Sequence, residues 1–383
     1  MYNKSNEVLS QVKDSLKSKK FQEFTRKKES NLKLCKFAYE QVVLADGELP
    51  DGPYMTKTTL ERIRSCSTMP EFAVPADFSK FKKISGFTCG DAWCPICSYY
   101  NARKHALAMS AQMDWMHEEL GLEFLMLTLT TPNVKGEELK RAVNDYYKAF
   151  RLMFDFVKKT NLHVAGCWRK LEVTYNTQKR ITQEMWDGSG KYNDPWKWKL
   201  GKMGLGVGDI NPMFNTFHPH YHVMLAVEPD YFRDKNGSYI SQEKWVELWR
   251  KYMSCEISEK AIKVQRVYKI KSESNSGISE IAKYVAKDVD YLYSPAVFRT
   301  FYNALKGAKR LTRWGVCQDG NKLFLEGKLD KYIPFDETQY KWAILYDWNG
   351  KAYNLKIGRD LSIDEASLVA GMRLDKASII DEI

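Results

Sequence analysis

Three of the six histidines in this chain fall at alternate positions within one short segment, FHPHYHVMLAV (217–227): His218, His220 and His222. The apolar run that follows them predicts a β-strand. Because alternate side chains of a strand share one face, the three imidazoles are expected to lie side by side. Neutral imidazole is the commonest metal ligand, and two on one face can bind a single ion. The alternative, that they face solvent and are incidental, suits a lone histidine better than three at this spacing.

An acidic partner for these histidines is expected from the preceding predicted strand, in which Glu172 of RKLEVTYN is the only acid. Apolar and β-branched residues surround it, and an ionised carboxylate is costly there unless it is paired or coordinating. We therefore expect Glu172 to join His220 and His222 as a metal ligand. Mixed nitrogen and oxygen ligands with open positions suit Mg²⁺ or Mn²⁺ delivered with a phosphate-bearing substrate better than a closed structural zinc.

A second candidate for chemistry is the segment ISEIAKYVAKDVDYLY (278–293), which predicts an amphipathic helix. Beside its apolar stripe runs a stripe of polar side chains: Glu280, Tyr284, Lys287 and Tyr291. A phenol with a pKa of about 10 is a weak nucleophile at neutral pH. A cationic neighbour and a metal that polarises the target would help Tyr284 attack phosphorus. The alternative is that these side chains form an ordinary solvated face of the helix. Only the presence of the histidine strand favours the catalytic interpretation over it.

Four of the eight cysteines are clustered in the pattern C-x22-C-x4-C-x2-C: Cys66, Cys89, Cys94 and Cys97. Two thiols at this short spacing on a turn, with two more upstream, predict a tetrahedral zinc site. Four closed ligands leave no open position, so the zinc would be structural. The alternative is a group of buried free cysteines near a turn. The remaining four are isolated in the sequence and predict no site: Cys35, Cys167, Cys255 and Cys317.

The candidate residues need elements to position them, and the apolar patterns alternate between strand and helix. Strands are expected at 122–133, 166–176, 217–227 and 261–270, and helices at 138–159, 241–253 and 278–293. This order predicts an α+β domain over 120–293, with helices packed on a central antiparallel or mixed sheet. Three regions would flank it: an N-terminal helical region (1–61), a four-cysteine module with a helix (62–119), and a C-terminal extension (294–383) with a hairpin at Asn349-Gly350.

The net charge of +11 and the isoelectric point near 9.0 favour a polyanionic partner. Nucleic acid is the first candidate, an anionic membrane surface the second, and a basic protein without such a partner the alternative. The N-terminus lacks the apolar core of a signal peptide, and no apolar run is long enough to span a membrane. We therefore expect a cytoplasmic protein with reduced cysteines.

Two stretches combine positive charge with features that suit DNA. The loop 177–208 interleaves basic and aromatic residues, among them Trp196, Lys197, Trp198 and Lys199. Such a loop can neutralise phosphates and stack exposed bases of single-stranded DNA. The segment NALKGAKRLTRW (303–314), with Lys309 and Arg310, could follow a DNA backbone. An ordinary mobile insertion is the alternative for the loop.

Three segments together resemble the ordered motifs of rolling-circle plasmid replication initiators in the HUH endonuclease superfamily: FLMLTLTTPN, HPHYHVML and SEIAKYVAKDVDYL. The similarity extends from about Arg62 to Lys331. It implies that the histidine pair, here His220 and His222, binds a divalent cation. It also implies that the tyrosine of the third motif, here Tyr284, cuts one DNA strand.

The resemblance is strongest to a single-tyrosine subgroup that has an N-terminal cysteine cluster and a glutamate four residues before the tyrosine, here Glu280. It implies sequence-specific nicking of the origin, a 5′-phosphotyrosyl link and a free 3′-OH primer. Glu280 would activate water for release at termination, and Lys287 would stabilise negative charge. The role of His218 stays open between ligand, DNA contact and bystander, and a second nucleophile at Tyr291 stays an alternative.

The partners implied are the double-stranded origin and single-stranded DNA, together with a host helicase and a single-strand-binding protein; a homodimer is an open alternative. Two other functions compete with replication initiation. One is a transposase or relaxase of the same superfamily, and the other is a non-catalytic, zinc-containing DNA-binding protein. The Glu280–Tyr284 pair and the cysteine cluster favour the initiator.

Overall fold

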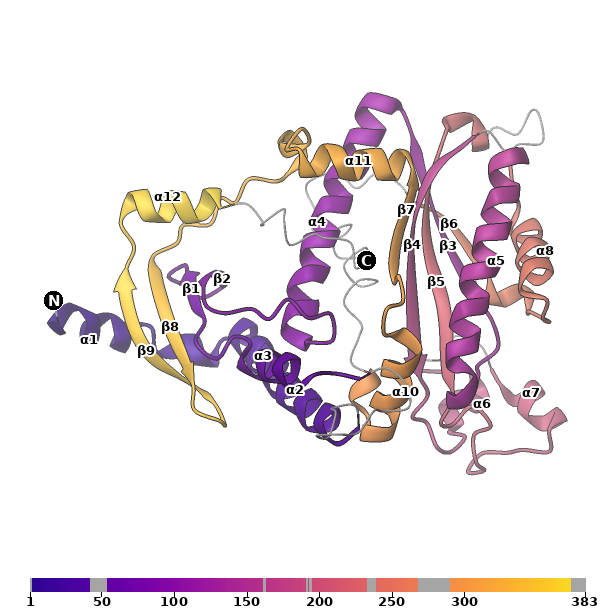
Figure 1. Cartoon of the computed structure of the whole chain (residues 1–383), viewed down its shortest axis with the longest axis horizontal. Coiled ribbons are helices and arrows are strands. Elements are labelled where there is room, and N and C mark those ends of the chain that lie inside the picture. The colour runs from indigo at the N-terminus through magenta and orange to yellow at the C-terminus, as the bar shows by residue number, and fades with distance from the viewer. Residues whose placement is uncertain are drawn as a thin grey trace. The chain divides into compact units, whose positions relative to one another are not determined.

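The computed structural model describes residues 2–41, 54–160, 163–190, 192, 195–232, 239–267 and 290–372 (Figure 1). The chain divides into two units. We call the first the histidine unit (Glu123–Tyr268 and Thr300–Trp314) and the second the cysteine unit (Met1–Leu122, Lys269–Arg299 and Gly315–Ile383). The α+β class predicted from the sequence is confirmed, since helices accompany an antiparallel sheet in each unit.

The histidine unit is built on a five-stranded sheet with the strand order β6-β3-β5-β4-β7. Its strands are β3 (Glu123–Thr130), β4 (Val164–Tyr175), β5 (Phe217–Val227), β6 (Lys263–Val267) and β7 (Leu311–Gly315). The pairs β3–β5, β4–β5 and β3–β6 are antiparallel. The histidine strand β5 therefore lies in the middle, where its apolar second half is buried.

Two amphipathic helices cover one face of this sheet: α5 (Leu139–Thr160) and α8 (Gln242–Met253). Ser241 caps α8 by accepting a hydrogen bond from the Lys244 amide, as expected for a serine at a helix start. Tyr221 on β5 is fully buried, and its ring contacts those of Tyr146 and Phe150 on α5. Since neighbouring residues of a strand point to opposite faces, His220 and His222 lie on the other face.

The connection between β4 and β5 forms a small folded lobe with two short helices, α6 (Gln183–Asp187) and α7 (Lys197–Lys202). An antiparallel bridge between Arg180 and Ile210 closes its base. Three buried apolar side chains fill its interior: Ile181, Met185 and Leu200.

The cysteine unit contains a four-stranded antiparallel sheet in the order β2-β1-β8-β9. Its strands are β1 (Glu71–Val74), β2 (Lys82–Ser85), β8 (Trp342–Trp348) and β9 (Tyr353–Asp360). The predicted hairpin at Asn349-Gly350 is present, and Gly350 adopts a φ of +97°, which favours glycine. The C-terminal hairpin thus completes a sheet whose first two strands lie between Cys66 and Cys89 in the sequence.

Helices of the cysteine unit pack on this sheet and on one another. They are α1 (Tyr2–Gln11), α2 (Lys19–Gln41), α3 (Lys57–Ser65), α4 (Pro95–Leu120), α11 (Val316–Leu325) and α12 (Ile363–Gly371). Phe21 and Phe24 of α2 pack their rings on Phe72 of β1. On the opposite face, Ala73 packs with Val369 of α12.

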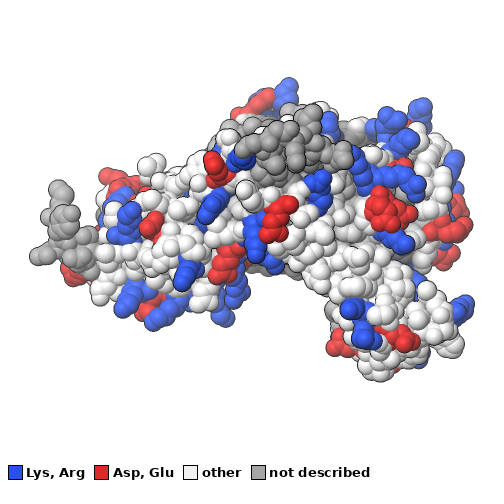
Figure 2. Space-filling model, turned by 60° about the horizontal axis from the view of Figure 1, so that its bottom comes forward, with Lys and Arg blue, Asp and Glu red and all other residues white. Residues whose placement is uncertain are grey.

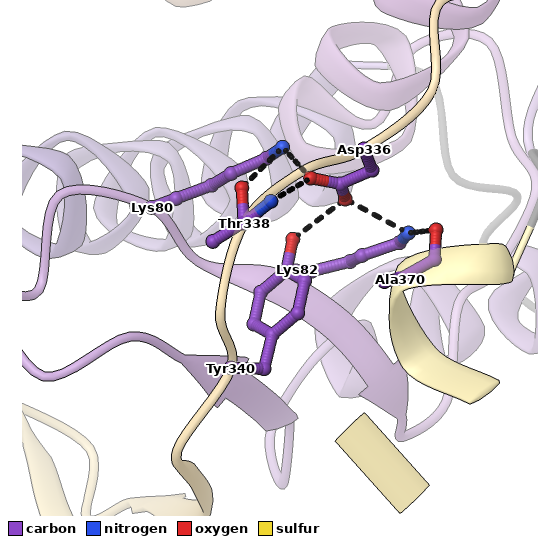
Figure 3. A network of polar contacts seen from close by, with 6 residues as sticks. All are labelled: Lys80, Lys82, Asp336, Thr338, Tyr340 and Ala370. Carbon is purple, nitrogen blue, oxygen red and sulfur yellow. Dashed lines mark hydrogen bonds and ion pairs between the residues drawn. The ribbon is translucent and has the colours of Figure 1, made fainter. Parts of the chain in front are cut away.

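A polar network fastens the C-terminal segment to β2 (Figure 3). The Asp336 carboxylate accepts hydrogen bonds from Lys80 Nζ at 2.6 Å, Lys82 Nζ at 3.1 Å and the Tyr340 hydroxyl at 2.9 Å. Lys82 Nζ also donates to the carbonyl of Ala370 near the end of α12. Burial would raise the pKa of Asp336, but these hydrogen bonds outweigh it and lower that pKa. The network therefore holds an ionised carboxylate between two lysines.

The remaining described helices are α10 (Pro295–Leu305) and six short 3₁₀ turns: Lys13–Lys17, Gly136–Glu138, Pro229–Phe232, Glu259–Ala261, Asp290–Leu292 and Asp330–Tyr332. Of the helix predicted at 278–293, residues 278–289 lie outside the described residues. Across the described ranges, none of the helices has the length and apolar character that crossing a membrane requires.

Candidate metal centres and nucleic-acid interface

The register between β4 and β5 brings the three predicted cation ligands together. Glu172 pairs directly with His220, and His222 follows two residues later on the same face. Glu172 Oε2 lies 3.4 Å from His220 Nε2 and 3.2 Å from His222 Nε2. One potential ligand atom from each residue lies within 4.8 Å of the other two. The geometry therefore permits one ion to contact all three side chains.

The hydrogen bond at Nδ1, the ring nitrogen of His220 that does not face Glu172, indicates which kind of group would suit this site. His220 Nδ1 lies 3.2 Å from the His218 carbonyl oxygen, which can only accept, so Nδ1 carries the hydrogen. In the neutral ring, Nε2 then presents a lone pair toward the Glu172 carboxylate oxygen, which also only accepts. A cation between two facing acceptors, either a proton or a metal ion, makes this contact favourable. The donor set fits a divalent metal, and the backbone hydrogen bond orients the imidazole for it.

The protonation states of Glu172 and His222 also suit metal binding. Glu172 is 5% exposed. Burial would raise the pKa of Glu172, but the neighbouring imidazoles of His220 and His222 outweigh it and lower the pKa below its usual value. Burial lowers the pKa of His222, with Glu172 acting in the opposite direction. An ionised carboxylate beside a neutral imidazole is the protonation state that metal binding needs.

His218 extends the histidine row but stands outside this group of three. Its ring stacks on that of His220, with the ring centroids 5.3 Å apart. Burial lowers the pKa of His218 to about 4. On the other side of β5, Thr128 and Thr130 of β3 lie opposite His222 and His220. The Thr130 hydroxyl donates to the carbonyl of Ala261 at 2.8 Å, which fixes its side chain beside the site.

The four clustered cysteines form a second candidate centre in the cysteine unit. The Sγ atoms of Cys66, Cys89, Cys94 and Cys97 lie within 4.8 Å of one another, and all four residues are buried. Cys97 Sγ is 3.6 Å from Cys66 Sγ and 3.5 Å from Cys89 Sγ. A tetrahedral zinc with bonds of about 2.3 Å separates its sulfur ligands by about 3.8 Å. The cluster is therefore compatible with a structural zinc ion.

Local structure explains how the cysteines converge. Cys94 is the N-cap of α4, Cys97 lies in its first turn, and Cys66 ends α3. The Gly90 amide donates to Cys97 Sγ at 3.3 Å. Cys167, which the sequence isolates, is buried in β4, where burial raises the pKa of its thiol. It is a small apolar side chain of the core.

Three predicted catalytic residues, Glu280, Tyr284 and Lys287, lie outside the described residues. Tyr291 is described and is 4% exposed. Its hydroxyl donates to the Trp93 carbonyl at 3.1 Å, and its ring packs edge-on against the Trp93 indole. A phenol held in this way is occupied in packing within the cysteine unit, which weighs against Tyr291 as a second nucleophile.

The residues predicted to contact DNA occupy two places in the histidine unit. On the lobe, Trp198 is 76% exposed, Lys197 and Lys199 are also exposed, and Lys199 Nζ lies 5.8 Å from the Trp196 ring centroid. The lobe also exposes apolar side chains that sequence reasoning missed: Met203, Val207 and Ile210.

The second place is the turn between α10 and β7, which carries Lys309 and Arg310. The Lys309 carbonyl accepts a hydrogen bond from the Tyr147 hydroxyl at 2.9 Å, and the Arg310 carbonyl accepts one from the Leu171 amide at 2.7 Å. These bonds fix the backbone and leave the Lys309 side chain exposed. The exposed face of α5 adds basic residues that sequence reasoning also missed, although its helical spacing would have indicated them: Arg141, Lys148, Arg151 and Lys159.

Positive charge is divided unequally between the two units. The histidine unit contains 27 Lys and Arg against 17 Asp and Glu, a formal charge of +10, whereas the cysteine unit contains 32 against 31. Figure 2 displays the basic side chains on one face of the molecule, with acidic side chains among them. Nearly all of the net charge of +11 therefore belongs to the unit that carries the histidine strand.

Fold and site together define an α+β protein with a buried two-histidine, one-carboxylate centre and a separate four-cysteine centre. The family model described as Replication protein (Rep_1) matches residues 80–354, which include the histidine strand and three of the four clustered cysteines. The chain belongs to this family of replication proteins. The resemblance to rolling-circle plasmid replication initiators is thereby confirmed at the level of the family, and an initiator of replication binds DNA.

Several curated relatives support the assignment. The chain is 31% identical over 271 residues to a protein named Protein rep from Staphylococcus aureus, covering 71% of this chain and 95% of that relative. It is 28% identical over 253 residues to a Protein rep from a Bacillus species, covering 62% of this chain and 69% of the relative. It is 25% identical over 269 residues to a Protein rep from Streptococcus pneumoniae, covering 70% and 72%. No solved structure matches the chain.

Proposed function

We propose that this replication initiator nicks one strand of its origin in a reaction that depends on a divalent cation and uses Tyr284 as the nucleophile. One observation carries the proposal: Glu172 Oε2 faces the Nε2 atoms of His220 and His222 at 3.4 and 3.2 Å on a buried sheet face. These three side chains would hold Mg²⁺ or Mn²⁺. When bound, the cation would withdraw negative charge from the scissile phosphate.

Each residue has a defined part in the proposed reaction. The Tyr284 hydroxyl loses its proton to water and its oxygen attacks phosphorus. A phosphotyrosyl ester forms at the 5′ end, the bond to O3′ breaks, and O3′ takes up a proton to leave a 3′-OH primer. The ammonium of Lys287 stabilises negative charge on the phosphate or the phenolate. At termination Glu280 accepts a proton from water, and the water oxygen attacks phosphorus. The bond between phosphorus and the Tyr284 oxygen breaks, and that oxygen takes up a proton, which releases the enzyme. A host helicase and a single-strand-binding protein belong to this proposal as partners.

A denaturing gel tests the proposal directly. The protein is incubated with a labelled single-stranded oligonucleotide that contains the origin, with Mn²⁺ or with a chelator. The expected result is a slowly migrating covalent adduct and a shortened strand, both only with Mn²⁺. Retention of the oligonucleotide on a native gel without any cleavage would instead favour a non-catalytic, zinc-containing DNA-binding protein. Preferential cleavage of the ends of a mobile element would favour a transposase or relaxase.

Glu280→Ala should separate nicking from release. Nicking within about threefold of the wild-type rate is expected, because Tyr284 and the cation ligands are intact, but the covalent complex should accumulate about 10²-fold because hydrolysis lacks its base. The measurement is a time course of adduct on a substrate that carries two nick sites. Glu280→Gln, which keeps the size of the side chain, serves as the matched variant. Normal release from both variants would show that another group accepts the proton from water.

The lobe and the basic turn are proposed to hold the DNA strand. Replacing Lys197, Lys199, Lys309 and Arg310 with glutamine should lower the salt dependence of binding. The slope of log K against log salt should fall by about 0.7 for each lost phosphate contact, or about 3 for all four. Fluorescence anisotropy at several salt concentrations measures the slope. Lys351→Gln and Lys356→Gln, on the exposed hairpin of the cysteine unit, are the control, and an equal effect of the control would contradict the proposal.

A further inference from the structure

Helix α2 buries a lysine completely. Lys28 is 0% exposed, and its Nζ donates hydrogen bonds to the carbonyl oxygens of Arg64 and Cys66, both at 2.8 Å. A third bond reaches the Thr68 hydroxyl oxygen at 3.3 Å. The ammonium therefore has three acceptors for its three hydrogens, and all three acceptors are uncharged.

A buried ammonium needs more than hydrogen bonds, because removing a full charge from water is costly unless an opposite charge lies nearby. Throughout the part of the chain that the structure describes, Lys28 makes no ion pair with a carboxylate. The group beside it that can carry negative charge is the cysteine cluster, since Lys28 bonds to the backbone of Cys66 itself. Four thiolates around one divalent ion leave a net charge of −2. An ammonium at the position of Lys28 would offset part of that charge.

Asn31, one turn further along α2, is a second buried polar residue that contacts the cysteine cluster. It is 0% exposed, and its Nδ2 donates to the Ile63 carbonyl at 2.9 Å and lies 3.3 Å from Cys94 Sγ. An N–H group aimed at sulfur favours the thiolate over the neutral thiol, because a donor stabilises the charged form. Residues three apart share one face of a helix, so α2 presents both groups to the cluster together.

We propose that α2 is an integral part of a metal centre at the four cysteines, with Lys28 as its counter-charge and Asn31 as its hydrogen-bond donor. Metal loading and the packing of α2 against α3 are then one event. Lys28, Asn31 and Cys66 all precede residue 80, where the family match begins. The metal would therefore tie the N-terminal region of this chain to the matched segment. The inference concerns the cysteine centre and is independent of the nicking reaction.

The test compares full-length protein with and without zinc. Lys28→Met keeps the length of the side chain and removes the charge, and Asn31→Leu keeps the approximate volume and removes the donor. Zinc transfer to a chromophoric chelator should be about 10- to 100-fold more favourable from either variant than from the wild type. Lys27→Met is the matched control, because Lys27 is only partly buried and its Nζ lies over the Tyr99 ring. It should retain zinc like the wild type.

Thermal unfolding distinguishes a counter-charge from a merely structural lysine. Lys28→Met should lower the Tm of the zinc-loaded protein more than that of the zinc-free protein. In the zinc-free protein the buried ammonium has no compensating charge, so it stabilises the fold less and its removal costs less. Chelation should also expose residues 19–41 to limited proteolysis. Equal loss of Tm in both states, or unchanged zinc retention in Asn31→Leu, would overturn the proposal. If Lys28→Met does not fold, Asn31→Leu and the proteolysis of the wild type decide the question.

Discussion

His222→Ala is expected to reduce Mn²⁺-dependent nicking by about 10³-fold or more. The Nε2 atom of His222 is one of three that converge on a single point, and its removal leaves His220 and Glu172 as the remaining ligands. Losing several kcal/mol of charge stabilisation at the phosphate corresponds to a factor of this size, since about 1.4 kcal/mol is tenfold in rate. Initial rates of oligonucleotide cleavage over a range of Mn²⁺ concentrations measure the effect, and His220→Ala should behave alike.

A histidine elsewhere in the same unit provides the control for this prediction. His163 faces Glu228 with Nδ1 3.0 Å from the carboxylate, but the pair lies at the surface, where such contacts contribute little. His163→Ala should therefore nick within about twofold of the wild-type rate, because it lies outside the cation ligands. Full recovery of His220→Ala and His222→Ala by excess Mn²⁺ would count against direct ligation by these histidines.

Tyr284→Phe is expected to abolish the covalent protein–DNA adduct while leaving origin binding nearly unchanged. The substitution removes only the oxygen that would attack phosphorus, so no ester can form. The residual rate should fall by about 10⁴-fold or more, as expected when a nucleophile is deleted. Adduct on a denaturing gel and binding by anisotropy are measured on the same preparation. Mass spectrometry of the digested wild-type adduct should locate the nucleotide on Tyr284.

Tyr291→Phe is the natural comparison, because this tyrosine lies on the same predicted stripe. Its hydroxyl is buried and bonded to the Trp93 carbonyl, so its loss should cost about 1 kcal/mol of stability and leave nicking intact. An adduct that persists in Tyr284→Phe but disappears in Tyr291→Phe would move the nucleophile to Tyr291. Loss of the adduct in neither variant would move it elsewhere in the chain.

The two candidate centres differ in the way that their proposed roles require. The cysteine cluster offers four buried ligands of one kind, which close a tetrahedron and leave no position for a substrate. The histidine centre offers three ligands of two kinds, which leave positions on a cation for phosphate oxygens. Removing metal from the first should therefore act mainly on stability, whereas removing it from the second should act mainly on the reaction.

Much of the histidine site was accessible from the sequence, because backbone geometry alone sets it. The two-residue period of a strand places His220 and His222 on one face whatever the strand packs against. The burial expected for Glu172 among apolar neighbours indicated a ligand, and the Asn349-Gly350 dipeptide indicated a hairpin turn, which the structure contains. The spacing of Cys94 and Cys97 is a local signal of the same kind, because Cys94 is the N-cap of α4 and Cys97 lies in its first turn.

Tertiary structure alone decided the features that depend on contacts between distant segments. A shift of one residue between β4 and β5 would have turned Glu172 away from the histidines, and only the packing of both strands fixes that register. No local pattern pairs Phe72 of β1 with Ile344 of β8, or places Lys28 of α2 beside Cys66. The division of the charge between the two units likewise follows from how the chain is partitioned. Periodicity is a property of a segment, whereas register and burial are properties of the whole fold.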